Sequence, residues 1–226
     1  MSLVDWRPPS LAVRGGGSIA ARHAWCVGRN YAEHAREMGA EPGDPLFFSK
    51  PAAAIVQADL VPYPPRTREL HHEVELVAVL GQGGSRLSAD RAATCIAAWG
   101  VGCDLTRRDV QAKAKQAGGP WALAKGFDAS GPVGELVPAT DWYPEPGHRI
   151  QLAVDEKPRQ HATLGEMLRT VPELLAALSA EVTLHAGDLL FTGTPAGVGP
   201  LQPGQYVRAG IDGLPELAFR IGEPDG

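Results

Sequence analysis

One stretch of the chain, residues 71–81 with the sequence HHEVELVAVLG, constrains the fold most. It is rich in β-branched and aliphatic residues and stops at a glycine, so it predicts a β-strand. Side chains alternate between the two faces of a strand, so Glu73 and Glu75 point the same way. The remaining residues make both faces apolar, which is typical of a strand inside a sheet. The stretch therefore predicts two partly buried carboxylates on one interior strand.

Two buried charges of one sign require a cation, a shared proton or basic partners. Residues two apart on a strand are separated by roughly 6–7 Å, which lets both carboxylates bend toward one ion such as Mg²⁺ or Mn²⁺. A Glu-x-Glu pair also occurs at solvated strand ends, so this motif alone leaves that alternative open.

The composition favours one large, β-rich domain. The chain has 226 residues, 27 of them glycine and 20 proline, which indicates many turns. We expect an N-terminal arm over residues 1–24 and a single domain over residues 25–226. The net charge of −5 disfavours nucleic acid and anionic membranes as partners. The three cysteines form no CxxC motif, and residues 1–23 lack the apolar core of a signal peptide, so we expect a cytoplasmic protein.

The first half of the chain predicts several short elements. Residues 1–23 contain Pro8-Pro9 and three consecutive glycines, which indicates a loosely structured arm before a strand at about residues 24–27. Asn30 and Glu33 have the spacing of a capping box, which predicts a helix of barely two turns ending before Gly39. So short a helix is marginal alone, so we expect it to become ordered over a bound ligand. A strand at residues 46–49 brings Lys50 near the site.

The second half predicts longer elements. Ser88 caps a helix with helically spaced apolar residues up to Trp99, and the next strand ends at Asp104. Thr106 and Asp109 resemble a capping pair for a helix through Lys115. We expect a further helix at about residues 164–178, a pair of strands within residues 206–221, and strands near residues 121–124, 150–154 and 188–192.

Three groups of residues suggest chemistry. Asp104 lies at a strand-to-helix junction and, with Glu73 and Glu75, supplies the oxygen ligands that Mg²⁺ and Mn²⁺ prefer. His71 and His72 are weaker candidates as ligands, and only His71 is in phase with the glutamates. Residues 192–199, TGTPAGVG, form a glycine-rich loop that suits an anion but also an ordinary turn. Lys125 follows an apolar run, where a buried cation needs a carboxylate or a substrate anion.

Five segments together resemble the fumarylacetoacetate hydrolase family, specifically its single-domain acylpyruvate and fumarylpyruvate hydrolase branch. They are residues 26–34 (CVGRNYAEH), 72–76 (HEVEL), 104–111 (DLTRRDVQ), 121–127 and 192–199. The resemblance implies an α+β fold, a mixed β-sandwich roll with peripheral helices, and a homodimer. After Lys125 the chain has Gly126 and Ala129-Ser130-Gly131 at positions where relatives vary, which leaves the length of the substrate open.

The resemblance also implies roles for individual residues. Glu73, Glu75 and Asp104 would bind one Mg²⁺ or Mn²⁺. His34 and Glu37 would form a water-activating pair on a mobile lid, and Lys125 would assist catalysis while holding the substrate. The substrate contacts would be Arg29, Arg108, Gln111 and Thr194.

The function implied is metal-dependent cleavage of the C–C bond of an acylpyruvate, giving pyruvate and a carboxylic acid. Two alternatives remain open. The same metal site would suit an oxaloacetate decarboxylase or a keto–enol tautomerase, and a protein that only binds a small oxo-acid would need no catalytic base. Without the resemblance, the spacing of His34 and Glu37 would indicate only a solvated ion pair on the protein surface.

Overall fold

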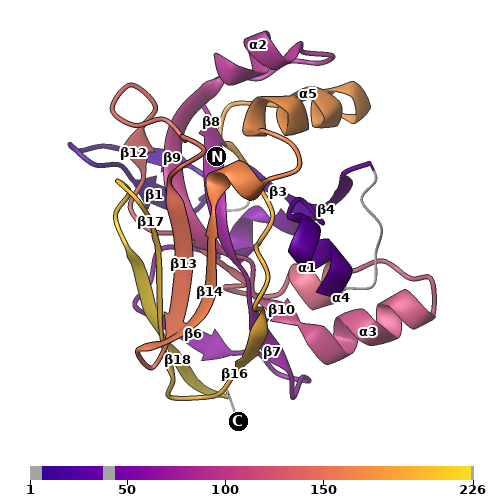
Figure 1. The fold of residues 1–226 in the computed structure, drawn as a ribbon. Coiled ribbons are helices and arrows are strands. Elements are labelled where there is room, and N and C mark those ends of the chain that lie inside the picture. The colour runs from indigo at the N-terminus through magenta and orange to yellow at the C-terminus, as the bar shows by residue number, and fades with distance from the viewer. Residues whose placement is uncertain (1–6, 38–43, 225–226) are drawn as a thin grey trace, which may run out of the picture.

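Two β-sheets pack face to face, and short helices surround them (Figure 1). The computed structural model describes residues 7–37 and 44–224. The six-stranded sheet has the order β12-β9-β8-β15-β3-β4 and contains both parallel and antiparallel pairs. The five-stranded sheet has the order β14-β13-β17-β18-β6. This mixed α+β sandwich confirms the expected fold class.

The strands of the six-stranded sheet are β3 (His23–Gly28), β4 (Leu46–Pro51), β8 (Val74–Leu80), β9 (Ile96–Cys103), β12 (Val137–Pro138) and β15 (Asp188–Phe191). The five-stranded sheet comprises β6 (Leu60–Tyr63), β13 (Arg149–Val154), β14 (Lys157–Thr163), β17 (Tyr206–Ile211) and β18 (Leu217–Pro224). A small sheet joins β7 (Leu70–His72), β10 (Thr106–Arg107) and β16 (Gly199–Leu201), and two pairs join β1 (Ser10–Ala12) with β2 (Ser18–Ala20) and β5 (Ile55–Val56) with β11 (Gly131–Pro132).

The helices are α1 (Ala32–Glu37), α2 (Ala89–Ala93), α3 (Arg108–Gln116), α4 (Ala122–Lys125) and α5 (Val171–Glu181), with 3₁₀ turns η1 (Ala52–Ala54) and η2 (Leu164–Glu166). Helices α2 and α5 pack together at one end of the sheets, whereas α1, α3 and α4 lie along one side (Figure 1). No helix in the described ranges combines the length and apolar character that a membrane span requires.

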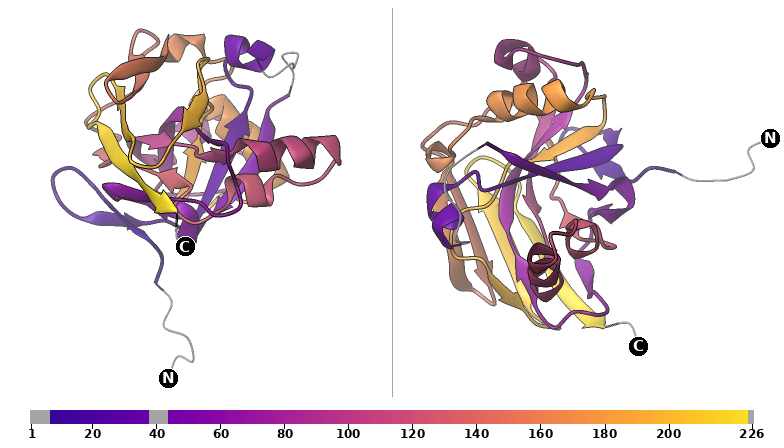
Figure 2. Two further views of the ribbon diagram at one scale, coloured as in Figure 1. Left: turned by 90° about the horizontal axis from the view of Figure 1, so that it is seen from below. Right: turned by 90° about the vertical axis from the view of Figure 1, so that its right-hand side faces the viewer.

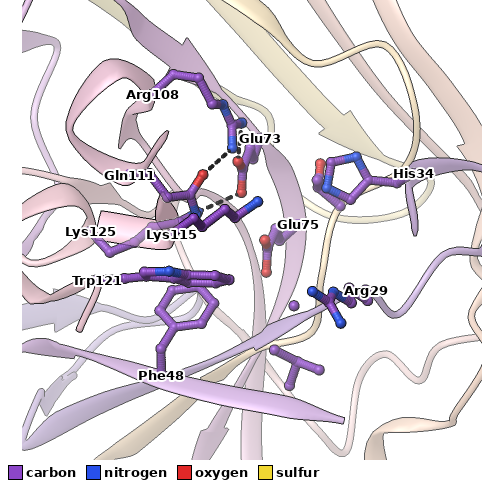
Figure 3. A pocket seen from close by; sticks show the side chains of 13 residues that line it. Arg29, His34, Phe48, Glu73, Glu75, Arg108, Gln111, Lys115, Trp121 and Lys125 are labelled. Atoms are coloured by element: carbon purple, nitrogen blue, oxygen red, sulfur yellow. Dashed lines mark hydrogen bonds and ion pairs between the residues drawn. The ribbon is translucent and has the colours of Figure 1, made fainter. Parts of the chain in front are cut away.

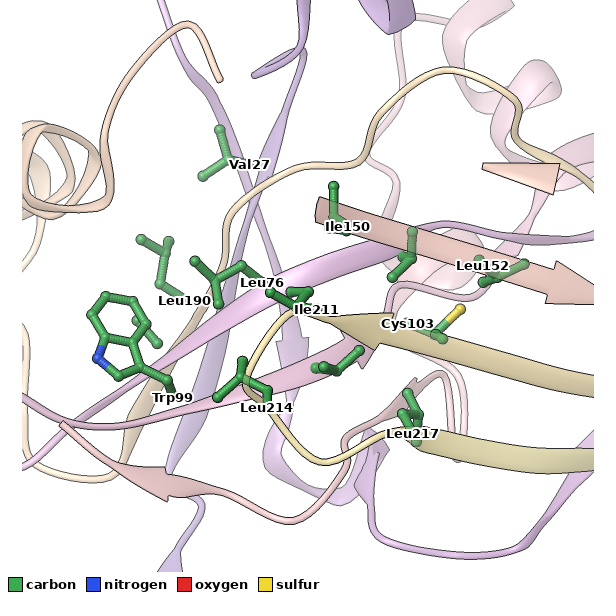
Figure 4. Close-up of a cluster of buried hydrophobic side chains, with 14 of the residues drawn as sticks. Val27, Leu76, Trp99, Cys103, Ile150, Leu152, Leu190, Ile211, Leu214 and Leu217 are labelled. Carbon is green, nitrogen blue, oxygen red and sulfur yellow. The ribbon is translucent and has the colours of Figure 1, made fainter. Parts of the chain in front are cut away.

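Both faces of β8 are buried, as its sequence predicts. Leu76 faces the main core between the sheets, where it meets Trp99 of β9 and Ile150 and Ile211 of the opposite sheet (Figure 4). On the other face, Val77 joins a second cluster with residues of β3 and β15. Every residue of β8 is buried, so the strand anchors both cores.

The strand expected over residues 71–81 is in fact two strands that meet at Glu73. β7 ends at His72 and pairs with β10 and β16, whereas β8 begins at Val74 and pairs with β9 and β15. The Glu73 carbonyl accepts a hydrogen bond from the Asp104 N–H at 2.8 Å. The chain therefore passes from one sheet to another at Glu73, one of the predicted metal ligands.

Two predicted elements have a different secondary structure. Ser88 caps α2 by accepting a hydrogen bond from the Arg91 N–H, but the helix ends at Ala93, and Trp99 belongs to β9. A strand that is buried on both faces has apolar residues at every position, so helical spacing also occurs within it. Residues 122–125 form α4 rather than a strand.

Two predicted capping residues have other roles. The Asn30 side chain donates to the carbonyl oxygens of Thr192 and Arg169 and accepts from the Arg169 N–H, so it ties together distant loops. Thr106 donates to Glu73 Oε1, and the residue preceding α3 is Arg107. Capping boxes form instead at Thr163 with Glu166, which begins the short 3₁₀ turn η2, and at Thr170 with Glu173. The helix α5 therefore begins at Val171 rather than near residue 164.

The N-terminal segment is more ordered than its composition predicts. Strands β1 and β2 form a hairpin at the edge of the molecule (Figure 2), with Gly15, Gly16 and Gly17 at positive φ in its turn. Leu11 of this hairpin is fully buried in the second core cluster. The glycines thus form a tight turn rather than a loose arm.

Candidate active site

Three buried carboxylates converge where strands end. Glu73 lies between β7 and β8, Glu75 lies on β8, and Asp104 directly follows β9. Antiparallel pairing of Glu75 with Gly102 brings Asp104 alongside Glu73. One oxygen from each carboxylate lies within 4.8 Å of the others, a spacing that one ion can bridge. The structure thus brings together the three residues that the sequence indicated as metal ligands.

Two lysines and one arginine surround these carboxylates. Lys125, at the end of α4, donates to Glu73 Oε2 at 2.8 Å and to Asp104 Oδ2 at 2.7 Å. Lys50 is fully buried, and its ammonium lies 2.8 Å from Asp104 Oδ1. Arg108 donates to Glu73 Oε1 at 2.5 Å and to Gln111 Oε1 at 2.6 Å. The sequence placed Lys50 only near the site, whereas the structure makes it a direct partner of Asp104.

The electrostatics of the cluster depend on these partners. Burial opposes ionisation of Glu73, but Lys125 and Arg108 outweigh it and hold its pKa well below the usual range. Burial and repulsion by Asp104 and Glu73 raise the pKa of Glu75 well above normal. Burial lowers the pKa of Lys125, but the two carboxylates raise it more. Lys125 offsets the effect on Glu75 only partly, and Glu75 forms no ion pair within the part of the chain that the structure describes. An all-oxygen site of this kind fits Mg²⁺ or Mn²⁺.

The glycine-rich loop binds a carboxylate of the protein itself. The Gly193 N–H donates to Glu75 Oε2 at 2.7 Å. Gly193 has φ +95°, and a Cβ at this position would lie 2.8 Å from the Asn30 Cβ, so only glycine fits. Next to it, the Thr194 hydroxyl accepts a hydrogen bond from Gln160 Nε2 at 2.8 Å. The loop therefore orients both Glu75 and Thr194.

Gln160, on β14 of the opposite sheet, was not predicted. Its Oε1 accepts from the Val74 N–H and lies 3.0 Å from His72 Nδ1. The buried His72 thus contacts Gln160. Neither His71 nor His72, the two weaker candidate ligands, belongs to the described carboxylate cluster. His71 lies against Arg108, and burial together with that guanidinium lowers its pKa to about 4. A lone glutamine on a strand carries no sequence signal for this role.

One pocket opens onto the cluster (Figure 3). His34 and Arg29 lie on one side of Glu73 and Glu75, and Trp121 and Lys125 lie on the other. The pocket is lined by Val27, Gly28, Arg29, His34, Phe48, Glu73, Glu75, Arg108, Gln111, Lys115, Trp121, Lys125 and Thr194. Nearly all predicted site residues therefore share one cavity, with Asp104 buried behind it. Glu37 belongs to α1, but its side chain lies outside the described part of the structure.

We expect Mn²⁺ or Mg²⁺ to stabilise the protein through these carboxylates. A ligand that binds only the folded state at a hundred times its Kd stabilises it by about 2.7 kcal/mol. Glu75→Gln should abolish most of this increase while leaving the metal-free protein at least as stable, because it removes a desolvated and repelled charge. Calorimetric Tm values after EDTA treatment, with and without Mn²⁺, measure both effects, and the exposed Glu135→Gln serves as control.

The same variant has a consequence for pH dependence. Because the pKa of Glu75 is raised on folding, its contribution to stability is present at low pH and is lost as the pH rises through the folded-state pKa. Metal-free Glu75→Gln should lack this loss. The assignment of Glu75 as a buried metal ligand would be contradicted if the variant's stability changed with pH as that of the wild type does. Full stabilisation of the variant by Mn²⁺ would also contradict it.

Lys50→Met is expected to destabilise the protein by about 3–5 kcal/mol, because it removes one partner of a buried ion pair and leaves the Asp104 charge partly uncompensated. Urea unfolding of the metal-free protein measures the change. Lys113→Met, at an exposed position on α3, is the control. A loss below about 1 kcal/mol, the range of surface pairs, would show that Asp104 does not depend on Lys50.

Comparison with known proteins gives consistent matches over nearly the whole chain. A family model described as fumarylacetoacetate (FAA) hydrolase C-terminal matches residues 23–222. The oxaloacetate tautomerase YcgM of Escherichia coli (strain K12) is 42% identical over 193 residues, 83% of this chain and 87% of the relative. The mitochondrial oxaloacetate tautomerase FAHD1 of Bos taurus is 39% identical over 203 residues, 88% and 91% of the two chains.

A solved structure adds a close match in fold. The crystal structure of fumarylpyruvate hydrolase from Pseudomonas aeruginosa in complex with Mn²⁺ and pyruvate has a TM-score of 0.95 and 39% sequence identity, and the match covers 99% of both chains. All residues that line the pocket lie within residues 23–222, the range that the family model matches.

Proposed function

The chain belongs to the fumarylacetoacetate hydrolase family, as its sequence motifs predicted, and from this premise we propose that it is a Mg²⁺- or Mn²⁺-dependent acylpyruvate hydrolase. The reaction cleaves the C–C bond of a β-diketone acid such as fumarylpyruvate and yields pyruvate and a carboxylic acid. The observation that supports it best is that His34, a potential base, lines the same pocket as Glu73, Glu75 and Lys125. A proposed homodimer can be tested by light scattering.

Glu73, Glu75 and Asp104 would hold the metal ion. When bound, the ion would polarise the 2-oxo group and adjacent carboxylate of the substrate. Arg108 and Gln111, which are already hydrogen-bonded to each other, orient that carboxylate from α3. The Thr194 hydroxyl is fixed by Gln160 and contacts the same end of the substrate. These contacts direct the distal carbonyl toward His34.

His34 removes a proton from water, and the resulting hydroxide adds to the distal carbonyl carbon. Glu37 orients the His34 ring. The C–C bond then breaks, its electron pair stays with the pyruvate fragment as the enolate, and the acyl fragment leaves as the carboxylic acid. Lys125 stabilises the enolate oxygen, and the proton held by His34 passes to the enolate carbon, so atoms and charge balance.

A second candidate is conversion of oxaloacetate, by keto–enol tautomerisation or by decarboxylation. It is favoured by the relatives YcgM and FAHD1, which are oxaloacetate tautomerases. These reactions use the same enolate stabilisation but no attacking water. The non-enzymatic alternative is a protein that only binds an oxo-acid. Such a protein needs no catalytic base, so the presence of His34 in the pocket does not favour this alternative.

One experiment separates these functions. EDTA-treated and Mn²⁺-loaded protein would be incubated with fumarylpyruvate, acetylpyruvate or oxaloacetate, and pyruvate release and ketonisation followed separately. We expect Mn²⁺-dependent release of pyruvate and an acid from an acylpyruvate. Turnover of oxaloacetate alone would replace our proposal with the second candidate, and calorimetric binding of oxalate without turnover of any substrate would indicate a binding protein.

A further inference from the structure

One buried glutamine of the second sheet connects two segments that contribute to the pocket. Gln160 of β14 is 1% exposed, and both ends of its amide have hydrogen-bond partners. Its Nε2 donates to the Thr194 hydroxyl at 2.8 Å and to the Pro195 carbonyl at 2.9 Å. Its Oε1 accepts from the Val74 N–H at 3.1 Å and lies 3.0 Å from His72 Nδ1. The amide thus contacts the glycine-rich loop on one side and the junction of β7 and β8 on the other.

Two backbone groups fix which end of this amide faces which segment. A peptide N–H can only donate, so the Val74 N–H requires the oxygen of Gln160. A carbonyl can only accept, so Pro195 requires the nitrogen of Gln160. Turning the amide over would set donor against donor and acceptor against acceptor at a buried position, which is costly. Because Oε1 of Gln160 has only lone pairs, His72 must carry a proton on Nδ1.

The same polarity determines what the Thr194 hydroxyl can do. The amide nitrogen of Gln160 can only donate, so the hydroxyl acts as the acceptor in this contact. Its own proton therefore points elsewhere, and within residues 7–37 and 44–224 it has no second hydrogen-bond partner. Thr194 lines the pocket although it is almost completely buried. A group with a lone pair inside the pocket would complete the hydrogen bonding of this hydroxyl.

We propose that Gln160 is a positioning residue that makes Thr194 a hydrogen-bond donor to the carboxylate of the substrate. This inference rests on the proposed function, which places the oxo-acid end of the substrate against Thr194. Gln160 does not line the pocket, so it acts through the hydroxyl. Hydrogen bonds to a charged acceptor are stronger than those to a neutral one, so a hydroxyl that can only donate favours an anion at this position.

A double-mutant cycle on ligand affinity tests this role apart from turnover. Mn²⁺-loaded protein would be titrated calorimetrically with oxalate. Gln160→Glu keeps the shape of the side chain and the acceptor for Val74, but it removes the donor to Thr194, whose hydroxyl would then donate to the introduced carboxylate. We expect Gln160→Glu to weaken oxalate binding about tenfold more in the wild-type background than in Thr194→Val, where there is no hydroxyl to reorient.

Three controls separate this effect from charge and packing. Repulsion between the introduced carboxylate and oxalate is present in both backgrounds of the cycle, so it cancels. Gln151→Glu places the same charge at an exposed position on the neighbouring strand β13, and its effect should not depend on Thr194→Val. Thr194→Ser retains the hydroxyl and should bind oxalate nearly as tightly as the wild type does.

Two results would overturn the inference. Equal weakening by Gln160→Glu in both backgrounds would leave Gln160 with a purely structural role, and wild-type affinity in Thr194→Val would show that the hydroxyl does not donate to the ligand. If Gln160→Glu fails to fold, Gln160→Met replaces it in the cycle. If both fail, Thr194→Ser and Thr194→Val decide the outcome, because equal affinity of these two for oxalate would also overturn the inference.

Failure of the proposed function looks different. A cycle that shows the expected dependence on Thr194, in a protein that hydrolyses no acylpyruvate, would reject the hydrolase but keep the role of Gln160. Acylpyruvate hydrolysis together with equal weakening in both backgrounds would do the reverse.

Discussion

His34→Ala is expected to lower kcat for acylpyruvate hydrolysis by about 10²–10⁴-fold, the usual contribution of a positioned general base. The imidazole is buried at the pocket wall, on the side opposite Lys125 (Figure 3). In the proposed mechanism it activates the water that attacks the distal carbonyl. Decarboxylation of oxaloacetate needs no activated water, so any such activity should fall much less. The measurement is kcat for both substrates at saturating Mn²⁺.

The control for this variant is His185→Ala, at an exposed histidine outside the pocket, which should affect neither reaction. A loss by the same factor in both reactions would mean that His34 shapes or closes the pocket. It would then no longer be the base that activates water.

Lys125→Met is expected to reduce acylpyruvate hydrolysis and oxaloacetate turnover together, each by about 10²–10³-fold. Both reactions develop negative charge on an enolate oxygen, and removal of one preorganised donor to such a charge costs this much. The ammonium also bridges Glu73 and Asp104, so the variant should bind Mn²⁺ differently. Rates are therefore compared at saturating Mn²⁺, with the folded fraction checked by circular dichroism.

Lys50→Met provides the matched comparison, because it also removes a cation from Asp104 but from a side chain that does not line the pocket. Its folded fraction should retain much more activity than Lys125→Met. Equal losses in the two variants would assign Lys125 a role in supporting Asp104 alone. Loss of hydrolysis with undiminished oxaloacetate turnover would contradict enolate stabilisation by Lys125.

Local sequence patterns predicted the elements whose physical cause is local. The run of apolar residues after Glu75 predicted the doubly buried β8, and Ser88 predicted the start of α2. The predictions were wrong where one sequence pattern fits two kinds of secondary structure. The spacing of Cys95, Ile96 and Trp99 fits a helix and a strand with apolar residues on both faces equally well. Ile96 and Trp99 belong to such a strand, β9, and Cys95 directly precedes it. Asn30 and Thr106 are residue types that often cap helices. In the structure, however, their side chains donate hydrogen bonds to the Thr192 carbonyl and to Glu73, respectively.

The sequence by itself determined the kinds of chemical groups and the family motifs that carry them. It supplied two carboxylates two residues apart at the start of an interior strand, a third at a strand end, and a cation after an apolar run. Only the tertiary structure decided which groups touch. Pairing of β8 with β9 brings Asp104 to Glu73, and packing of the second sheet brings Gln160 to Thr194. Such contacts join residues far apart in the chain, and burial of apolar strands in a particular register sets their geometry, which no local pattern contains.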